Sequence, residues 1–104
     1  MSQVEWKLLH PRMTMEHLGF IPAWLRDDNP KSAKQQLHEG YPFGGFQPFQ
    51  GFRLLENNAL VYPGDPPQQP LAEASLRDEL IVFYPSSWVA VIQKDRSFEV
   101  ARFD

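Results

Sequence analysis

Cysteine is missing from the 104-residue chain, and its absence removes several classes of chemistry. A disulfide framework, a zinc site built on thiolates and a cysteine nucleophile all need the side chain that the sequence lacks. A basic excess is missing too, because 10 lysines and arginines stand against 13 acidic residues, for a net charge of −3. Nucleic-acid-binding domains usually carry such an excess, and anionic membranes attract polybasic stretches. The charge balance therefore argues against both partners.

Long apolar runs are also missing. No stretch approaches the length of a transmembrane helix, and the N-terminal MSQVEWKLLHPRM interrupts its apolar residues with charges, unlike a secretory signal. We therefore expect a soluble cytoplasmic protein. The length suits one compact domain over residues 1–104, and a hydrophobic share of 42% is enough to fill one core.

The sequence also lacks recognisable catalytic motifs. Ser86-Ser87 lacks the Gly-x-Ser-x-Gly elbow of a hydrolase, and Gly44-Gly45 is not followed by the Lys-Ser or Lys-Thr of a phosphate loop. No two of His10, His17 and His38 have the spacing that pairs metal ligands on one helix face. The pattern argues against an enzyme and against a bound metal or cofactor. A small hydrolase or metal enzyme that uses one of these histidines is the weakest alternative.

β-branched and aromatic residues dominate the C-terminal third. Segments 80–84, 88–93 and 98–103 are joined by short links, which predicts a three-stranded antiparallel meander with an apolar central strand. The alternation of VEWKLL over 4–9 predicts a further strand. Turn-prone residues 56–58 predict a β-hairpin between 52–55 and 59–62.

Helix start and stop signals fill the N-terminal part. Thr14 is a candidate N-cap, and Pro22 suits the first position of a second helical turn, so we expect a broken helix over 14–26. Asn29-Pro30 and Gly40 delimit a mostly polar surface helix over 31–39, and 71–77 is expected to form a short helical turn. Short N-terminal helices packed on a small antiparallel sheet (meander, hairpin and N-terminal strand) make an α+β domain.

The stretch YPFGGFQPFQGF, over 41–52, holds five aromatic residues and no charge. We expect an irregular backbone over 41–50. Burial of a phenylalanine is worth about 1.5–3 kcal/mol, so we expect Phe49 and Phe52 to be buried. The more N-terminal rings are expected to be partly exposed and to bind a partner. The candidate interaction surface comprises Trp24, Tyr41, Phe43, Phe46, Tyr62 and Asp65.

Alternatives remain open for this surface and for the chain around it. The same rings could stack on single-stranded nucleic acid, with phosphates met by Lys31, Lys34 and Arg53. The segment Pro67-Gln-Gln-Pro70 fits a proline ligand for an aromatic groove, although a rigid connection is the simpler interpretation. The strand over 98–103 is a candidate sheet edge that could pair two copies. The sequence leaves the oligomeric state open.

Four segments together carry a resemblance: RMTMEHLGFIPAWL, PFQGF, YPGDPP and WVAVIQKDRSFEVARFD. In these segments the chain resembles a family of short, uncharacterised proteins encoded in bacteriophages and prophages of proteobacteria. The resemblance extends from Trp6 to Asp104 and brings no catalytic residue with it. It implies a phage or prophage origin, expression in a bacterial cytoplasm, and a non-enzymatic accessory role in which the chain binds a phage or host protein.

Overall fold

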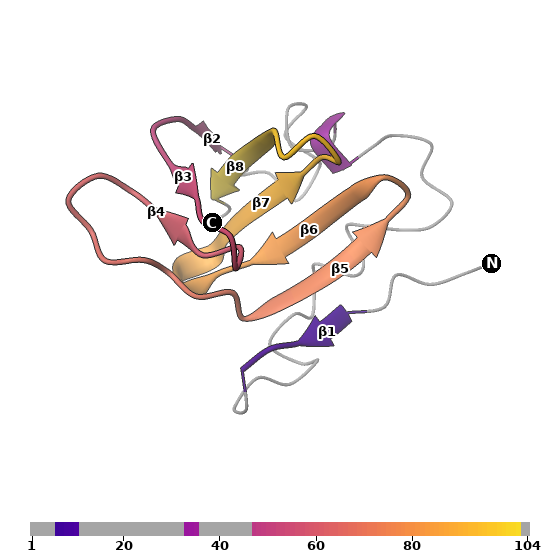
Figure 1. The fold of residues 1–104 in the computed structure, drawn as a ribbon, viewed down its shortest axis with the longest axis horizontal. Coiled ribbons are helices and arrows are strands. Elements are labelled where there is room, and N and C mark those ends of the chain that lie inside the picture. Colours follow the sequence, from indigo (N-terminus) through magenta and orange to yellow (C-terminus); the bar gives the residue numbers. More distant parts are fainter. Residues whose placement is uncertain (1–5, 11–32, 36–46, 103–104) are drawn as a thin grey trace.

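A computed structural model describes residues 6–10, 33–35 and 47–102 (Figure 1). Its centre is one antiparallel sheet of six strands, whose backbone ladders run without a break from one edge to the other. In spatial order the strands are β1 (Trp6–Leu8), β5 (Ala72–Leu76), β6 (Glu79–Phe83), β7 (Trp88–Ile92), β8 (Phe98–Arg102) and β2 (Gln47–Phe49). A second, two-stranded sheet pairs β3 (Arg53–Leu54) with β4 (Leu60–Val61).

The expected meander, hairpin and N-terminal strand are confirmed. β6, β7 and β8 follow one another as antiparallel neighbours, and the 3₁₀ turn η2 (Pro85–Ser87) joins the first two. β7 lies in the middle of this meander and is buried from Val89 to Ile92, as a strand covered on both faces should be. β1 alternates as predicted, with Trp6 buried and Lys7 exposed.

The α+β prediction is wrong. The fold is mainly antiparallel sheet, and the described residues contain no helix of seven or more residues; 33–35 are α-helical and η2 is a single 3₁₀ turn. The segment expected to be a helical turn over 71–77 instead forms β5, which pairs with β1 on one side and β6 on the other. Pairing on both sides outweighs the helix propensity of its alanine, glutamate and leucine residues. The helix expected over 14–26 lies outside the described residues.

The end of the aromatic stretch is also a strand where an irregular backbone was expected. Gln47–Phe49 pairs with β8, so that Pro48 lies opposite Ala101. Proline is tolerated there because β2 is an edge strand and need not donate on both sides. The same pairing corrects a second prediction, since β8 is flanked by β7 and β2 and is not an edge.

The core occupies both faces of the sheet because successive residues of each strand point to opposite sides. One cluster contains Trp6, Ala74 and Ile81, together with Ala33 of the helical segment. The other cluster is covered by the β3–β4 hairpin, and its members include Leu60, Val82, Tyr84, Ala90, Ile92 and Val100. No helix among the described residues has the length and apolar character needed to cross a membrane.

Two side chains of the large sheet hold the hairpin at its turn. The buried Tyr84 hydroxyl donates to the Asn58 carbonyl at 2.7 Å. The Arg96 guanidinium donates to Asn58 Oδ1 at 3.1 Å and to the Leu55 carbonyl at 3.3 Å. Burial raises the pKa of Tyr84, and the nearby Arg96 charge opposes part of that rise. The hairpin is therefore fixed on the sheet at the end that carries its turn.

Candidate functional site

Three rings meet where the open end of the hairpin lies over β7, and we call Phe52, Tyr62 and Trp88 the aromatic cluster. The Phe52 ring centroid lies 5.0 Å from that of Tyr62 and 4.9 Å from that of Trp88. Both pairs are inclined, at 56° and 60°, which are geometries that aromatic side chains favour. Phe52 is thus the central ring of a continuous aromatic surface.

The register of the sheet adds a cation to this cluster. Trp88 at the start of β7 lies directly opposite Arg102 on β8. The guanidinium carbon of Arg102 lies 5.6 Å from the centre of the Trp88 ring, within the range of a cation–π contact. This contact places a positive charge next to the Trp88 side of the aromatic cluster.

Two rings of the aromatic cluster pack against the core, and the third is exposed to solvent. Phe52 and Trp88 are half-buried and pack against the buried residues of the second core cluster. Tyr62 is 43% exposed, the largest exposed fraction among the described large hydrophobic residues. Gly51 permits this arrangement, because it has φ +100°, a backbone conformation that residues with a Cβ rarely adopt. The site combines a fixed base with an accessible aromatic ring.

The chain leaves the cluster through an exposed loop of residues 62–67, which we call the proline loop. Its first four residues form a tight turn in which the Asp65 N–H donates to the Tyr62 carbonyl at 3.0 Å. Gly64 adopts φ +90°, and Pro63 precedes it, as a type II turn requires. At the foot of the loop Leu60 and Gln68 exchange two backbone hydrogen bonds, at 3.0 and 2.8 Å. The loop therefore contains a hydrogen-bonded turn and is closed at its foot by two backbone hydrogen bonds.

The structure brings together two of the six residues predicted for the interaction surface. Tyr62 and Asp65 form the ends of one hydrogen-bonded turn and are both exposed. The other four lie outside the described residues: Trp24, Tyr41, Phe43 and Phe46. Phe52 was expected to be buried and is half-buried, because it shares its environment with the exposed Tyr62 ring. The side chain of Phe49 is likewise outside the described part of the chain.

Sequence reasoning missed Trp88 and Arg102 as members of this surface. A tryptophan that opens an apolar strand has the pattern of a core residue, and Trp88 is indeed half-buried. Arg102 belongs to this surface only because the strand register places it opposite Trp88, and the sequence alone does not give that register. The one available signal was the alternation within the 98–103 strand. It places Arg102 on the face opposite to that of Ala101.

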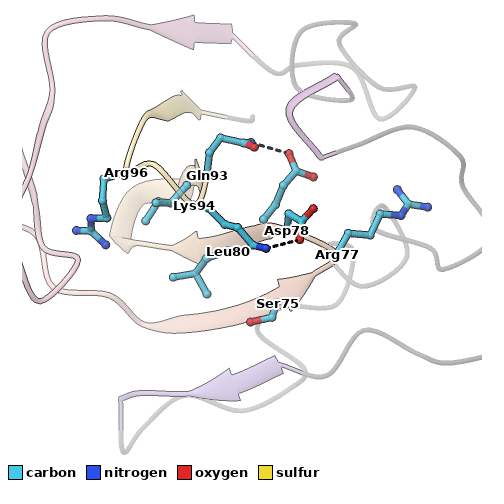
Figure 2. Close-up of a pocket in the computed structure, with 9 residues that line it drawn as sticks. Ser75, Arg77, Asp78, Leu80, Gln93, Lys94 and Arg96 are labelled. Carbon is cyan, nitrogen blue, oxygen red and sulfur yellow. Dashed lines mark hydrogen bonds and ion pairs between the residues drawn. The ribbon is translucent and has the colours of Figure 1, made fainter.

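Away from the aromatic cluster, a polar pocket of about 320 Å³ lies between the β5–β6 and β7–β8 turns (Figure 2). Its polar side chains include Ser75, Arg77, Asp78, Gln93, Lys94 and Arg96. Asp78 and Lys94 form an ion pair at 3.2 Å across its mouth, and both are largely exposed. Arg96 is committed to the hairpin, so the basic groups do not converge on a common point.

The wall of this pocket contains the buried carboxylate of Glu79, which is 7% exposed. It accepts hydrogen bonds from the backbone N–H groups of Ala33 and Lys34, at 2.8 and 3.1 Å, and from Gln93 Nε2 at 2.9 Å. Three donors satisfy the charge without any cation. Glu79 therefore attaches the helical segment to the sheet, and the pocket around it is architectural.

The described residues among those named for the two alternative functions are not assembled into a site. Lys34 lies 3.8 Å from Glu99 and lines a second polar hollow together with Asp78 and Asp95. Arg53 is exposed on the hairpin, and Lys31 lies outside the described residues. His10 is exposed just after β1, whereas His17 and His38 are outside the described part. Within that part, no group of three or more histidine and acidic residues could hold a metal ion.

Comparison of the chain with protein-family models, with curated proteins and with solved structures finds no match.

Proposed function

We propose that the protein is a non-enzymatic protein-interaction module of phage or prophage type, which binds a phage or host protein in the bacterial cytoplasm. The observation that carries this proposal is the exposed Tyr62 ring, which packs on Phe52, whose ring packs in turn on Trp88. The resemblance of four sequence segments to phage and prophage proteins supports the stated origin.

The chemistry of the aromatic cluster suits protein recognition. Tryptophan, tyrosine and arginine are the residues that most often dominate the binding energy of protein interfaces. Here Tyr62, Trp88 and Arg102 form one surface with Phe52. Because the rings are already fixed by contacts with one another and with the core, little conformational entropy is lost when a partner covers them.

The two edges of the large sheet offer poorer sites. β1 carries the exposed Lys7 at its centre, and a charged edge strand resists pairing with a foreign strand. β2 carries Pro48 at its centre, which has no N–H to donate. Recognition through the aromatic cluster and the proline loop is therefore favoured over addition of a strand.

The experiment is a capture from lysates of proteobacteria with and without phage infection, using immobilised wild type, Tyr62→Ser and Leu9→Ser. Leu9 is the matched control, since it is also an exposed large hydrophobic residue, at 38%, but lies beyond β1. We expect one protein to be retained by wild type and Leu9→Ser. Its affinity for Tyr62→Ser should be lower by about tenfold or more, since loss of a central interface aromatic costs about 2 kcal/mol or more.

Three results contradict the proposal. Equal retention by wild type and Tyr62→Ser would remove the aromatic cluster from the interface. Recovery of single-stranded nucleic acid in place of protein, again dependent on Tyr62, would favour the nucleic-acid alternative. If no protein is retained from either infected or uninfected lysate, neither a phage protein nor a host protein is the partner, and the proposal fails.

A further inference from the structure

We propose that the proline loop enters a groove of the partner that is lined by aromatic side chains, so that the partner is a proline-reading protein. This inference rests on the proposed function and specifies the chemistry of the partner. The loop offers three exposed prolines, Pro63, Pro66 and Pro67, on six consecutive exposed residues.

The second half of the loop has the backbone that such grooves bind. Proline fixes its own φ near −65°, and the residue before a proline is driven to extended conformations. Asp65 precedes Pro66, and Pro66 precedes Pro67, so both are subject to this restriction. Two successive restricted residues favour the polyproline II conformation, which aromatic-lined grooves recognise with little loss of entropy.

The first half of the loop fixes where these prolines point. The Tyr62–Asp65 hydrogen bond and the positive φ of Gly64 set the reversal that precedes Pro66. The paired backbone hydrogen bonds join Leu60, two residues before the loop begins, to Gln68, one residue after it ends, and so close the loop. These hydrogen bonds restrict the loop more than a free peptide of the same sequence is restricted, and preorganisation of that kind improves affinity.

The structure also changes which prolines of this segment are candidates for recognition. The spacing Pro67-Gln-Gln-Pro70 suggested a recognition motif over 67–70. Gln68 is held by its backbone to Leu60, and Pro70 is half-buried, so that this segment forms the foot of the loop. Within residues 62–70, the prolines that are exposed to a partner are the three that precede Gln68. Tyr62 lies beside them and supplies an aromatic contact at the rim of the groove.

The test uses purified domains with aromatic proline-binding grooves as probes: an SH3, a WW and an EVH1 domain. Each is titrated to millimolar concentration into isotope-labelled protein, and the amide signals of Gly64 and Asp65 are followed by NMR. We expect at least one domain to shift both signals. A Pro66→Ala/Pro67→Ala variant should bind that domain about tenfold more weakly, because its loop is no longer restricted to the extended backbone.

Leu9→Ser serves as the control and should bind as wild type does. The Pro66→Ala/Pro67→Ala variant changes only exposed positions, and unchanged amide signals of β6 and β7 verify its fold. Absence of loop shifts with all three domains would overturn the inference, as would equal binding by the double variant. If Tyr62-dependent capture of a partner persists in either case, the proposed function stands and only the proline-reading partner is lost. If the loop signals shift but no partner is captured through Tyr62, the loop binds proline-reading domains and the proposed function is the claim that fails.

Discussion

The carboxylate of Glu79 accepts a hydrogen bond of 2.8 Å from the backbone N–H of Ala33, a residue 46 positions earlier in the chain. Glu79 comes directly after the β5–β6 turn, and Ala33 is one of the three residues described in the helical segment. Both groups are buried, so neither can exchange its partner for water without opening the structure. This contact joins the helical segment to the large sheet.

Replacement of Glu79 by glutamine should destabilise the fold. A glutamine has one acceptor oxygen where the carboxylate has two, so its NH₂ group must face either the Ala33 N–H or the Lys34 N–H and Gln93 Nε2. At least one buried N–H then loses its partner, which lowers the free energy of unfolding by about 1–3 kcal/mol. Urea unfolding of wild type and Glu79→Gln measures the difference.

Asp78→Asn is the matched control for this prediction. It removes the neighbouring carboxylate, whose ion pair with Lys94 is largely exposed, and exposed pairs contribute about 0–1 kcal/mol. If the two variants lose equal stability, the effect of Glu79 is one of surface charge and the assigned attachment is wrong.

Alkaline pH should destabilise the protein through Tyr84. Burial raises the pKa of this phenol above its ordinary value of about 10, so the folded state keeps its proton where the unfolded state loses it. The stabilisation is therefore complete below the unfolded pKa and is lost as the pH rises above it. Above about pH 10 the wild type should lose about 1.4 kcal/mol per pH unit more than Tyr84→Phe does.

The measurement is urea unfolding of both proteins at a series of pH values from neutral to alkaline. Below pH 10 Tyr84→Phe should be less stable by about 0.5–1.5 kcal/mol, because the hydrogen bond to the Asn58 carbonyl is gone. The two proteins differ only at this side chain, so the difference between their profiles reports on Tyr84. Parallel pH profiles for the two proteins would show that the Tyr84 hydroxyl is accessible to solvent.

Asp95 should titrate below the usual range of an aspartate. The Ser97 hydroxyl and then the Ser97 backbone N–H, at 2.6 and 2.9 Å from Asp95 Oδ1, lower the pKa of its carboxyl. A lowered pKa gives a stabilising contribution that is present above the unfolded value and is lost as the pH falls through the folded one. In Ser97→Ala the pKa should rise but stay below the ordinary value, since the backbone donor remains. NMR titration of the Asp95 carboxyl carbon measures both values, and no change in Ser97→Ala would refute the assigned cause.

The strands with a strong pattern were predictable from the sequence, whereas β2 and β5 were not. The segments over 80–84, 88–93 and 98–103 are rich in residues that suit a buried sheet, and β6 to β8 form there. β5 has the composition of a helix, and its turn to β6 carries Arg77 and Asp78 without the glycine or asparagine that marks a two-residue hairpin. Arg77 nevertheless adopts φ 57°, so the turn depends on the pairing of its strands and not on its own residues.

The candidate site was predictable only in part, because its members come from distant segments. Tyr62 and the proline loop stand out locally, since tyrosine, glycine and proline follow one another over 62–67. Trp88 and Arg102 join them only after the sheet register is known. The buried Glu79 has no local signal at all, since an acidic residue after a turn is normally exposed. Long-range pairing is what a single sequence does not reveal.

The sheet edge at β1 leads to a prediction about self-association. In the described sheet β1 has a neighbour on one side only, where Trp6, Lys7 and Leu8 pair with β5. No described residue pairs with the other side of β1, and Lys7 is the one charged residue on the strand. A lysine on an edge strand opposes pairing, because burial of its charge between two strands is costly and two copies bring like charges together.

Lys7→Val should therefore increase self-association. Valine suits a strand and removes the charge, so that two β1 edges can pair without repulsion. Light scattering across a concentration series should show a larger average mass for Lys7→Val than for wild type. Lys94→Val is the control, because it also replaces an exposed lysine by valine but lies in the β7–β8 turn, away from both edges. Equal association of the two variants would assign the effect to net charge and not to the edge, and an unchanged mass for Lys7→Val would show that the charge does not protect β1.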